Sequence, residues 1–379
     1  MGEFANAPYV AETQMSEREK PRLLILSNFL SVHGGTRSVA EDLADQFEQR
    51  GYRVLRSSSK RNKVARLLDR VGTILRRRGE YDVACADVYS GPAFVWAEAA
   101  CCALRLAGRP CIMTLHGGNL PRFAQRWPRR VRRLLASARS VTAPSKYLFE
   151  QMRTYRQDLV LLPNALDLSR YPFAPRSSAA PRLVWLRAFD ETYNPSMAVR
   201  VLAILSKEFA DVRLTMFGPD KGDGSVARCR ATAHELGVSE RVTMPGGVPK
   251  SEVPAALQQG DIFLNTTNVD NAPVSVVEAM ACGLCVVSTR VGGIPYLLDD
   301  EQDSLLVPAG DPEAMACAVR RILADPSLAA RLSQNARRKA TAFDWPPVLA
   351  QWERLVAEVA SGATSWTSSD LSTSRSRPV

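Results

Sequence analysis

The sequence lacks the features of a membrane-spanning or disulfide-stabilised protein. No uninterrupted apolar run approaches the roughly 20 residues that a transmembrane helix needs. Residues 1–20 are polar and charged and lack the apolar segment of a signal peptide, so we do not expect export. Of the eight cysteines, only Cys282 and Cys285 form a Cys-x-x-C pair, and no second pair or nearby histidine completes a zinc site. These absences favour a cytoplasmic protein whose cysteines are reduced and mostly packed in its core.

Acidic residues are scarce in the N-terminal half. Residues 50–80 contain eleven Lys or Arg against two acids, and residues 103–156 contain twelve against Glu150 alone. With a net charge of +10, the chain is expected to face a membrane surface, nucleic acid or a phosphorylated substrate. Nucleic-acid binding requires aromatic residues among the basic ones for stacking, but residues 60–78 contain none and residues 126–139 only Trp127. We therefore do not expect nucleic acid as a partner.

Short apolar segments alternate with helical patterns along the whole chain. This alternation predicts parallel sheets covered by helices on both faces, the α/β class, and 379 residues leave room for two such domains. A proline-rich connection over residues 171–181 separates the two series. The expected strands are residues 23–26, 52–56, 82–88, 110–115, 140–143 and 159–162 before the connection, and 183–186, 212–217, 242–244, 261–264 and 285–288 after it.

The stretch from Asp270 to Glu278 joins an expected strand to an expected helix. Pro273 suits the first helical position, and a helix that begins at the carboxyl end of a strand is a ready site for phosphate. Glu278 lies about one turn deeper, where its carboxylate could accept hydrogen bonds from sugar hydroxyls. The other interpretation is a buried helix with a capping Asp270 and a surface Glu278. The N–H groups expected to point out of the helix are those of Val274, Ser275 and Val276, with the Ser275 hydroxyl beside them.

A set of motifs in a fixed order resembles the retaining, GT-B-fold glycosyltransferases of family 4, the group 1 type. The resemblance covers about residues 22–351, and it rests on the order of the motifs because any one of them alone would be weak. The motifs are Gly34-Gly35 after the first strand, Thr114-Leu115-His116-Gly117-Gly118, Ala143-Pro144-Ser145, Leu162-Pro163-Asn164-Ala165-Leu166-Asp167, Arg187, Phe217-Gly218, and Asp270…Glu278 continuing through Ala279-Met280-Ala281-Cys282-Gly283.

The resemblance implies a role for each of these positions. Glu278 is expected to bind the ribose of a nucleotide sugar and Asp270 the hydroxyls of the transferred sugar. Because aspartate stands where the family has glutamate, the sugar contact could be rearranged or pass through Asn271. Arg187 is expected to bind the diphosphate, for which a guanidinium fork is suited. His116 is expected to meet the donor sugar near the reacting carbon, although an ordinary loop histidine is the alternative. The glycines Gly34, Gly35 and Gly218 are expected to admit the backbone close to phosphate or sugar.

The phosphate contacts depart from the family pattern at one place. Asn194-Pro195 stand where Lys-Gly would be expected, so the second phosphate contact falls either to Asn194 or to Lys221 in the loop after Gly218. The base is expected at the backbone of Val248 and Pro249. With Arg187 and the helix dipole supplying positive charge, no metal or other cofactor is expected, and retention of configuration would proceed by front-face attack.

The implied architecture is two Rossmann-like domains facing each other across a cleft. The expected activity is transfer of a sugar from a nucleotide-diphosphate sugar to an acceptor in exopolysaccharide, lipid-linked or other glycoconjugate assembly. A nucleotide-sugar epimerase or a phosphorylase of the same fold is the alternative within enzymes. The expected segments are a disordered N-terminus (1–20), an acceptor domain (21–171), a nucleotide-sugar domain (182–343), a helix crossing back to the first domain (344–360) and a disordered tail (361–379).

The arginines of residues 126–138 allow two interpretations. On an expected helix, Trp127, Val131, Leu134 and Leu135 share one side, a pattern typical of a helix lying in a membrane interface with cations among anionic headgroups. The hypothesis is that this side, helped by residues 60–78, binds the inner leaflet. Alternatively, the apolar side packs on the core and the arginines are solvated. The cations concerned are Arg126, Arg129, Arg130, Arg132 and Arg133.

Overall fold

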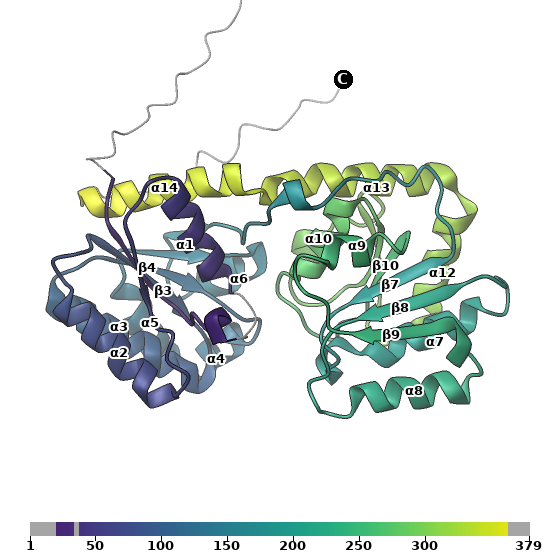
Figure 1. Ribbon diagram of the computed structural model, residues 1–379, viewed down its shortest axis with the longest axis horizontal. Helices are drawn as coiled ribbons and strands as arrows, with labels where there is room; N and C mark the ends of the chain where they lie inside the picture. Colours follow the sequence, from purple (N-terminus) through teal and green to yellow (C-terminus); the bar gives the residue numbers. More distant parts are fainter. Residues whose placement is uncertain (1–19, 34–37, 363–379) are drawn as a thin grey trace, which may run out of the picture.

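The computed structural model describes residues 20–33 and 38–362, which form two domains with a parallel six-stranded sheet in each (Figure 1). Neighbouring strands of the first sheet follow the order β2-β1-β3-β4-β5-β6, which is the doubly wound order of flavodoxin-like, Rossmann-related folds. The carboxyl ends of its strands therefore meet at one edge. These strands are β1 (Leu23–Leu26), β2 (Val54–Ser57), β3 (Val83–Val88), β4 (Cys111–Leu115), β5 (Ser140–Ala143) and β6 (Leu159–Leu161).

Helices cover both faces of the first sheet. On one face α1 packs with the C-terminal helix, and on the other α2, α3, α4 and α5 form a layer over Leu24, Leu26 and Met113. Helix α1 begins with a capping box, in which the Ser38 hydroxyl accepts from the Glu41 N–H and the Glu41 carboxylate accepts from the Ser38 N–H. The helices are α1 (Val39–Gln49), α2 (Lys63–Arg76), α3 (Phe94–Ala107), α4 (Leu120–Arg126), α5 (Pro128–Ala136) and α6 (Lys146–Met152).

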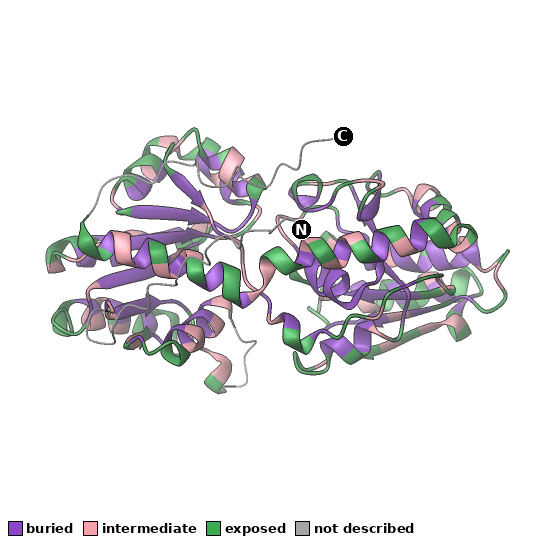
Figure 2. Ribbon diagram, turned by 90° about the horizontal axis from the view of Figure 1, so that it is seen from above, coloured by how far each residue is buried: buried purple, intermediate pink, exposed green. Residues whose placement is uncertain are grey.

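The second domain is also a doubly wound parallel sheet, but its strand order, β12-β11-β10-β7-β8-β9, is that of the Rossmann fold itself. Its inner strands are almost wholly buried between two helical layers, whereas the edge strand β9 is only partly buried and the helices expose their outer sides (Figure 2). The strands are β7 (Arg182–Leu186), β8 (Arg213–Phe217), β9 (Val242–Gly246), β10 (Ile262–Asn265), β11 (Cys285–Thr289) and β12 (Ser304–Val307). The helices are α7 (Pro195–Leu205), α8 (Ser225–Glu235), α9 (Val253–Leu257), α10 (Val274–Cys282), α11 (Ile294–Leu297), α12 (Pro312–Ala324) and α13 (Pro326–Ala340).

Helix α14 (Trp345–Ser361) returns the chain to the first domain (Figure 1). Asp344 caps its N-terminus and also accepts a hydrogen bond from the Leu168 N–H, so the cap ties the helix start to the segment between the domains. The buried side of α14 carries Trp345, Trp352 and Val356, which pack against Ile25 of β1 and its neighbours. This burial holds the end of the chain on the first domain.

Three secondary-structure expectations were wrong. The helix expected over residues 126–138 is two helices, α4 and α5, with Trp127 between them. Pro273 lies at the N-cap of α10 rather than at its first helical position, because its ψ of 117° is extended. Strand β12 was not expected, since its apolar run is only three residues long and follows an acidic stretch.

Candidate active site

Arg187 and Asp270 are brought together although 83 residues separate them in the chain. Arg187 follows β7 and Asp270 lies in the loop between β10 and α10, and their side chains form an ion pair. The guanidinium carbon also lies 4.2 Å from the centroid of the Tyr193 ring, so a cation–π contact fixes it from a second direction. The Arg187 Nε atom is buried without a hydrogen-bond partner. One donor of the fork is thus left for a ligand.

Gly218 lets the backbone after β8 approach Arg187. Its φ is 153°, and an added Cβ would lie 1.6 Å from the Arg187 carbonyl oxygen, a distance no side chain could tolerate. The Arg187 N–H donates to the Phe217 carbonyl at 3.1 Å. Gly218 therefore fixes the position of Arg187.

The N-terminus of α10 has unsatisfied donors beside this pair. The Ser275 hydroxyl is buried and has no hydrogen-bond partner, and the N–H groups of Val274 and Ser275 have none among the described residues. The Val276 N–H, which we expected to be free, instead donates to the Pro273 carbonyl at 3.1 Å. That expectation was wrong because the extended Pro273 closes a turn. Two N–H groups, one hydroxyl and the helix dipole remain to hold an anion.

Glu278 lies on α10 and is buried, with 6% of its surface exposed. The Tyr171 hydroxyl donates to its Oε1 at 2.7 Å. Burial raises the pKa of the Glu278 carboxyl, and the Tyr171 hydrogen bond and the charges of Lys250 and Arg187 oppose that rise. A buried carboxylate with one protein partner keeps acceptor capacity for further hydroxyl donors.

Asn271 connects the two domains. The Ser145 hydroxyl, which caps α6 of the first domain, donates to the Asn271 Oδ1 atom. A Cβ added to Gly118 would lie 3.7 Å from the Asn271 Cβ, so the loop that follows His116 lies against the Asp270–Asn271 loop. On the other side, a Cβ at Gly293 would lie 1.6 Å from the Asn271 carbonyl oxygen. The loops after β4 and β10 therefore meet at this point.

The remaining second-domain candidates surround the site at different depths. Asn194 has a left-handed backbone (φ 46°), and its Nδ2 lies 3.4 Å from the Asn268 Oδ1 in the loop that carries Asp270. Lys221 is exposed, and its backbone N–H donates to the Phe189 carbonyl at 3.3 Å. Val248 is half-buried and Pro249 exposed, in the loop after β9. Gly34 and Gly35 lie outside the described residues.

His116, after β4, is oriented by a carboxylate of the neighbouring strand. Its Nε2 lies 3.0 Å from the Asp87 Oδ1, and its ring stacks on Tyr89 with centroids 4.9 Å apart. The Ser27 hydroxyl donates to the other Asp87 oxygen. Burial acts to raise the pKa of Asp87, but the charge and hydrogen bond of His116, with Ser27 and Arg70, outweigh it, so the pKa is lowered. Asp87 thus stays ionised and holds the imidazole in place.

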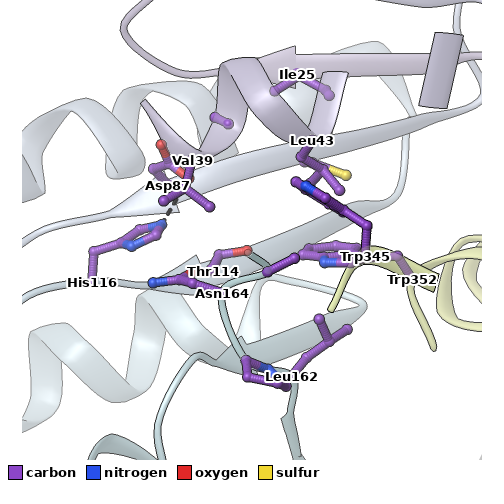
Figure 3. A pocket seen from close by; sticks show the side chains of 14 residues that line it. Ile25, Val39, Leu43, Asp87, Thr114, His116, Leu162, Asn164, Trp345 and Trp352 are labelled. Carbon is purple, nitrogen blue, oxygen red and sulfur yellow. Dashed lines mark hydrogen bonds and ion pairs between the residues drawn. The ribbon is translucent and has the colours of Figure 1, made fainter. Parts of the chain in front are cut away.

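A pocket in the first domain opens beside this pair (Figure 3). His116 and Asp87 form one end, Thr114 and Asn164 lie in the middle, and Trp345 of α14 lies toward the other end. The rest of its lining is mostly apolar and comes from β1, α1, β3, the segment after β6 and α14.

The apolar side chains of residues 126–138 do not form an exposed surface together with the five arginines of this segment. Val131, Leu134 and Leu135 are buried in the first core, whereas Trp127 is 47% exposed. The expectation that Leu134 and Leu135 are available to an apolar phase was therefore wrong, because this side of α5 packs on the sheet. Arg130 forms an ion pair with Glu98 of α3, while Arg126, Arg129, Arg132 and Arg133 are exposed.

Two kinds of feature are absent from residues 20–33 and 38–362. No group of three or more His, Cys, Asp or Glu side chains there is arranged to hold a metal ion. No helix in these ranges combines the length and the apolar character needed to cross a bilayer.

The geometry is that of a two-domain protein of the GT-B class, with a candidate anion site on the second domain. Residues 174–339 match the model of the "Glycosyl transferases group 1" family, and residues 54–170 match "Glycosyltransferase Family 4". The chain is a glycosyltransferase of this group 1, family 4 type.

The curated relatives share its sequence at a moderate level. The GDP-mannose-dependent alpha-(1-6)-phosphatidylinositol monomannoside mannosyltransferase of Mycolicibacterium smegmatis is 26% identical over 83% of this chain and 86% of its own length. A phosphatidylinositol N-acetylglucosaminyltransferase component from Arabidopsis thaliana is 31% identical over 43% of this chain. The chain spans 36% of that plant protein and 55% of a D-inositol 3-phosphate glycosyltransferase from Segniliparus rotundus.

Solved structures share the fold over nearly the whole chain. The Anabaena protein Alr3699/HepE, crystallised with UDP, matches with a TM-score of 0.72 and 18% identity over 89% of this chain and all of that one. Sucrose-phosphate synthase from Thermosynechococcus elongatus matches with a TM-score of 0.73 and 19% identity over 91% of this chain and all of that one. These similarities confirm the predicted GT-B fold.

The sequence did not predict the side chains that hold the expected site residues in position. Tyr193 lies under Arg187, Tyr171 binds Glu278, and Asp87 orients His116. Asp87 left a signal, because it interrupts the buried part of an expected strand, where an acid needs a partner. Tyr171 left none, because its partner Glu278 is 107 residues away in the sequence, and Tyr193 left none because it lies in a short turn whose sequence pattern does not indicate the contact with Arg187.

Proposed function

We propose that the enzyme moves a sugar, with retention and without a metal, from a nucleoside-diphosphate sugar to a hydroxyl of a lipid-linked or other glycoconjugate acceptor. The observation that carries the proposal is that two buried donors lack a partner. One is Nε of Arg187, whose guanidinium is paired with Asp270, and the other is the Ser275 hydroxyl at the N-terminus of α10. Such donors suit a diphosphate whose negative charge grows as the glycosidic bond breaks. Relatives named for GDP-mannose and for N-acetylglucosamine transfer support this donor class.

In this proposal each residue acts on one part of the donor. Glu278 binds the ribose hydroxyls, Asp270 orients Arg187 and contacts the sugar, and His116 contacts the sugar from the first domain. The bond from the anomeric carbon to the diphosphate oxygen breaks, and the diphosphate takes the electron pair. The acceptor oxygen then forms the new bond on the same face and passes its proton to the departing diphosphate.

The test is a thermal-shift screen against nucleotides and nucleotide sugars, because a ligand that binds only the folded state raises its stability. We expect one nucleoside diphosphate and its sugar to raise the melting temperature of the wild type. Glu278→Ala should remove most of this shift, whereas Glu235→Ala, which changes an exposed glutamate of α8, should keep it. A panel without any shift, or shifts equal in Glu278→Ala, would contradict the proposed donor site.

We also propose that the enzyme works at the cytoplasmic face of a membrane, bound peripherally. Val64 and Leu68 of α2 are 68% and 67% exposed, and Trp127 lies exposed among the arginines of α4 and α5. Helices α2, α3 and α5 lie side by side on one face of the first sheet (Figure 1). Apolar side chains among cations are typical of a surface that binds anionic lipid. Relatives named for phosphatidylinositol-based acceptors are consistent with such a location.

Vesicle sedimentation tests the membrane proposal. Wild type should bind anionic vesicles in low salt, neutral vesicles weakly, and anionic vesicles less in high salt. Leu68→Ser with Trp127→Ser should reduce the bound fraction severalfold. Leu236→Ser, an exposed leucine of the second domain, is the matched control and should not. Equal binding to neutral and anionic vesicles would contradict the proposal, and the arginines would then be ordinary solvated side chains.

A further inference from the structure

Helix α2 buries arginines and exposes apolar residues, which is the reverse of an ordinary amphipathic helix. Arg66 and Arg70, together with Ile74, lie at four-residue spacing on its inner side. The two arginines are 7% and 8% exposed, whereas Val64 and Leu68 on the outer side are more than half exposed. Burying a guanidinium in place of a leucine is unfavourable unless the cation meets a partner.

The protein supplies partners for only part of these two guanidinium groups. We call Arg66 and Arg70 the α2 arginine pair. Nη2 of Arg70 donates to the Asn28 Oδ1 at 2.9 Å and to the Ser27 carbonyl, but its Nε has no partner. Nε and Nη1 of Arg66 have none either. The structure records no ion pair between this pair and a carboxylate of the described residues.

Most of the buried polar atoms that lack a hydrogen-bond partner lie in two groups. Eight buried side-chain N or O atoms lack a hydrogen bond in the part of the chain that the structure describes. Arg187 and Ser275 account for two, at the donor site. The α2 arginine pair and the Ser57 hydroxyl account for four, and the Ser57 carbonyl accepts from the Ser27 N–H, beside the carbonyl that Arg70 binds. The first domain therefore has a second set of donors prepared for a ligand.

Both cations contact the ring of Trp96, which lies on α3. The guanidinium carbons of Arg66 and Arg70 lie 5.3 Å and 5.2 Å from the centroid of its ring. A ring face attracts a cation but accepts no strong hydrogen bond, so the N–H edges remain available. Burial lowers the pKa of Arg70 to about 10; the charge of Asp87 opposes this shift, and the charge of Arg66 adds to it. Like charges four residues apart on one side of a helix repel each other, and an anion beside both would relieve that repulsion.

The α2 arginine pair is connected to His116. Arg70 donates to the Ser27 carbonyl, the Ser27 hydroxyl donates to Asp87, and Asp87 binds His116. An anion at the pair would therefore lie in the first domain, near the pocket that His116 and Asp87 line (Figure 3). The donor diphosphate would lie across the domain boundary, at α10.

We propose that the α2 arginine pair binds a phosphate group carried by the acceptor. The inference rests on the proposed function, because it assigns the acceptor of that same reaction to the class of phosphorylated hydroxyl compounds. Guanidinium forks match phosphate oxygens in geometry and charge. The phosphate could belong to a lipid headgroup or to a soluble phosphorylated compound. Val64 and Leu68, on the outer side of the same helix, are the apolar side chains of α2 that a bilayer would meet.

Two binding measurements test the proposal. The first is a titration of inorganic phosphate, at constant ionic strength and with the nucleoside diphosphate present to fill the donor site. The second is sedimentation with vesicles of phosphatidylcholine alone or with phosphatidylinositol. The variants are Arg66→Gln with Arg70→Gln, and the control Arg76→Gln, an exposed arginine of the same helix. The double variant should weaken phosphate binding at least tenfold, and the control less than twofold.

The vesicle arm identifies the source of the phosphate. If inorganic phosphate and phosphatidylinositol vesicles both lose binding in the double variant, either source is accommodated; if only the vesicles do, the headgroup is the ligand. Binding of phosphate and vesicles that is unchanged in the double variant overturns the proposal. Nucleoside diphosphate affinity should stay within twofold in every variant, so a failure of the donor site is recognised separately. Arg66→Lys, which keeps the charge without the fork, replaces the double variant should that one not fold.

Discussion

Arg176 and Arg66 are buried to nearly the same extent, at 6% and 7% exposure, but only one of them is satisfied. Arg176, in the segment between the domains, pairs with Asp261 and donates to the carbonyls of Gly260 and Cys282. Arg66 leaves two nitrogens without a partner. A buried cation with all its donors occupied supports the fold, whereas one with open donors is prepared for something absent from the chain.

The same contrast separates groups within the second domain. Asp261 lies between Arg176 and Arg182, away from the anion site. These two arginines occupy the acceptor positions of its carboxylate. Arg187, Ser275 and Glu278 are buried or half-buried with incomplete hydrogen bonding, and all three lie on α10 or beside its N-terminus. Buried polar groups with unfilled hydrogen-bonding positions therefore indicate the candidate site better than burial alone does.

The largest expected effect on stability is at Arg176. Arg176→Gln should lower the free energy of unfolding by about 3 kcal/mol, because it leaves part of the buried Asp261 charge and two carbonyls uncompensated. Arg182→Gln is the control, since its side chain is 57% exposed and it pairs with the same carboxylate, and it should cost less than about 1 kcal/mol. Denaturant unfolding measures both. Arg66→Gln should cost less than Arg176→Gln, and equal losses would remove the distinction between the two arginines.

The largest expected effect on activity is at Arg187. Arg187→Ala should lower kcat about 100- to 1000-fold, the range for loss of one strong electrostatic donor to a developing charge. Arg187→Lys should restore part of the rate, because the charge returns without the fork. Steady-state kinetics with the donor identified by thermal shift gives the measurement. A rate within threefold of wild type would show that the open Nε has no catalytic role.

The sheets and the order of the motifs could be predicted because they depend on local patterns. Buried parallel strands form short apolar runs, and a proline next to a helix start limits the backbone in ways that a sequence displays. The inward arginines of α2 could not be predicted, because helical periodicity assigns Val64 and Leu68, not Arg66, to the core. The Arg187–Asp270 pair was also beyond reach, since its partners meet only after two strands and two loops are placed.

Glu278 and Asp270 should differ in which step they affect. Glu278→Ala should weaken nucleoside diphosphate binding at least tenfold, because its carboxylate has one protein partner and capacity for the ribose. Asp270→Ala should lower kcat with a smaller change in affinity, because it releases Arg187 without removing it. Calorimetric titration with the nucleoside diphosphate and single-turnover rates separate the two. Nucleotide affinity that survives in Glu278→Ala would remove it from the ribose site.

Substitution of Asn194 or Lys221 should have a smaller effect on nucleoside diphosphate binding. The comparison identifies which of the two residues makes the second phosphate contact. Asn194 is fixed against Asn268 near Asp270, whereas Lys221 is exposed and would have to move. Whichever of Asn194→Ala and Lys221→Ala weakens nucleoside diphosphate binding more identifies the contact; we expect a severalfold loss. Lys207→Ala, an exposed lysine remote from both loops, is the control for charge alone. Binding unchanged in both variants would leave Arg187 and α10 as the whole phosphate site.

The smallest expected effect is a pH-dependent gain of stability in Glu278→Gln. Because burial raises the pKa of Glu278 in the folded state, its folded form binds a proton more tightly than the unfolded chain, whose glutamates have a pKa of about 4.3. Below that pH both states are protonated and the wild type is not penalised; as pH rises through the folded pKa, the buried charge destabilises the fold. Glutamine stays neutral and still accepts from Tyr171.

Thermal melts of the ligand-free protein at pH 4.5 to 8 measure this effect. The melting temperature of Glu278→Gln should equal that of wild type at the acid end and exceed it by a few degrees at neutral pH, since each unit of pKa rise corresponds to about 1.4 kcal/mol. Glu235→Gln, at an exposed position, should show no such trend. A constant difference across the pH range would mean that Glu278, like Asp261, is satisfied by the protein and is not held open for a ligand.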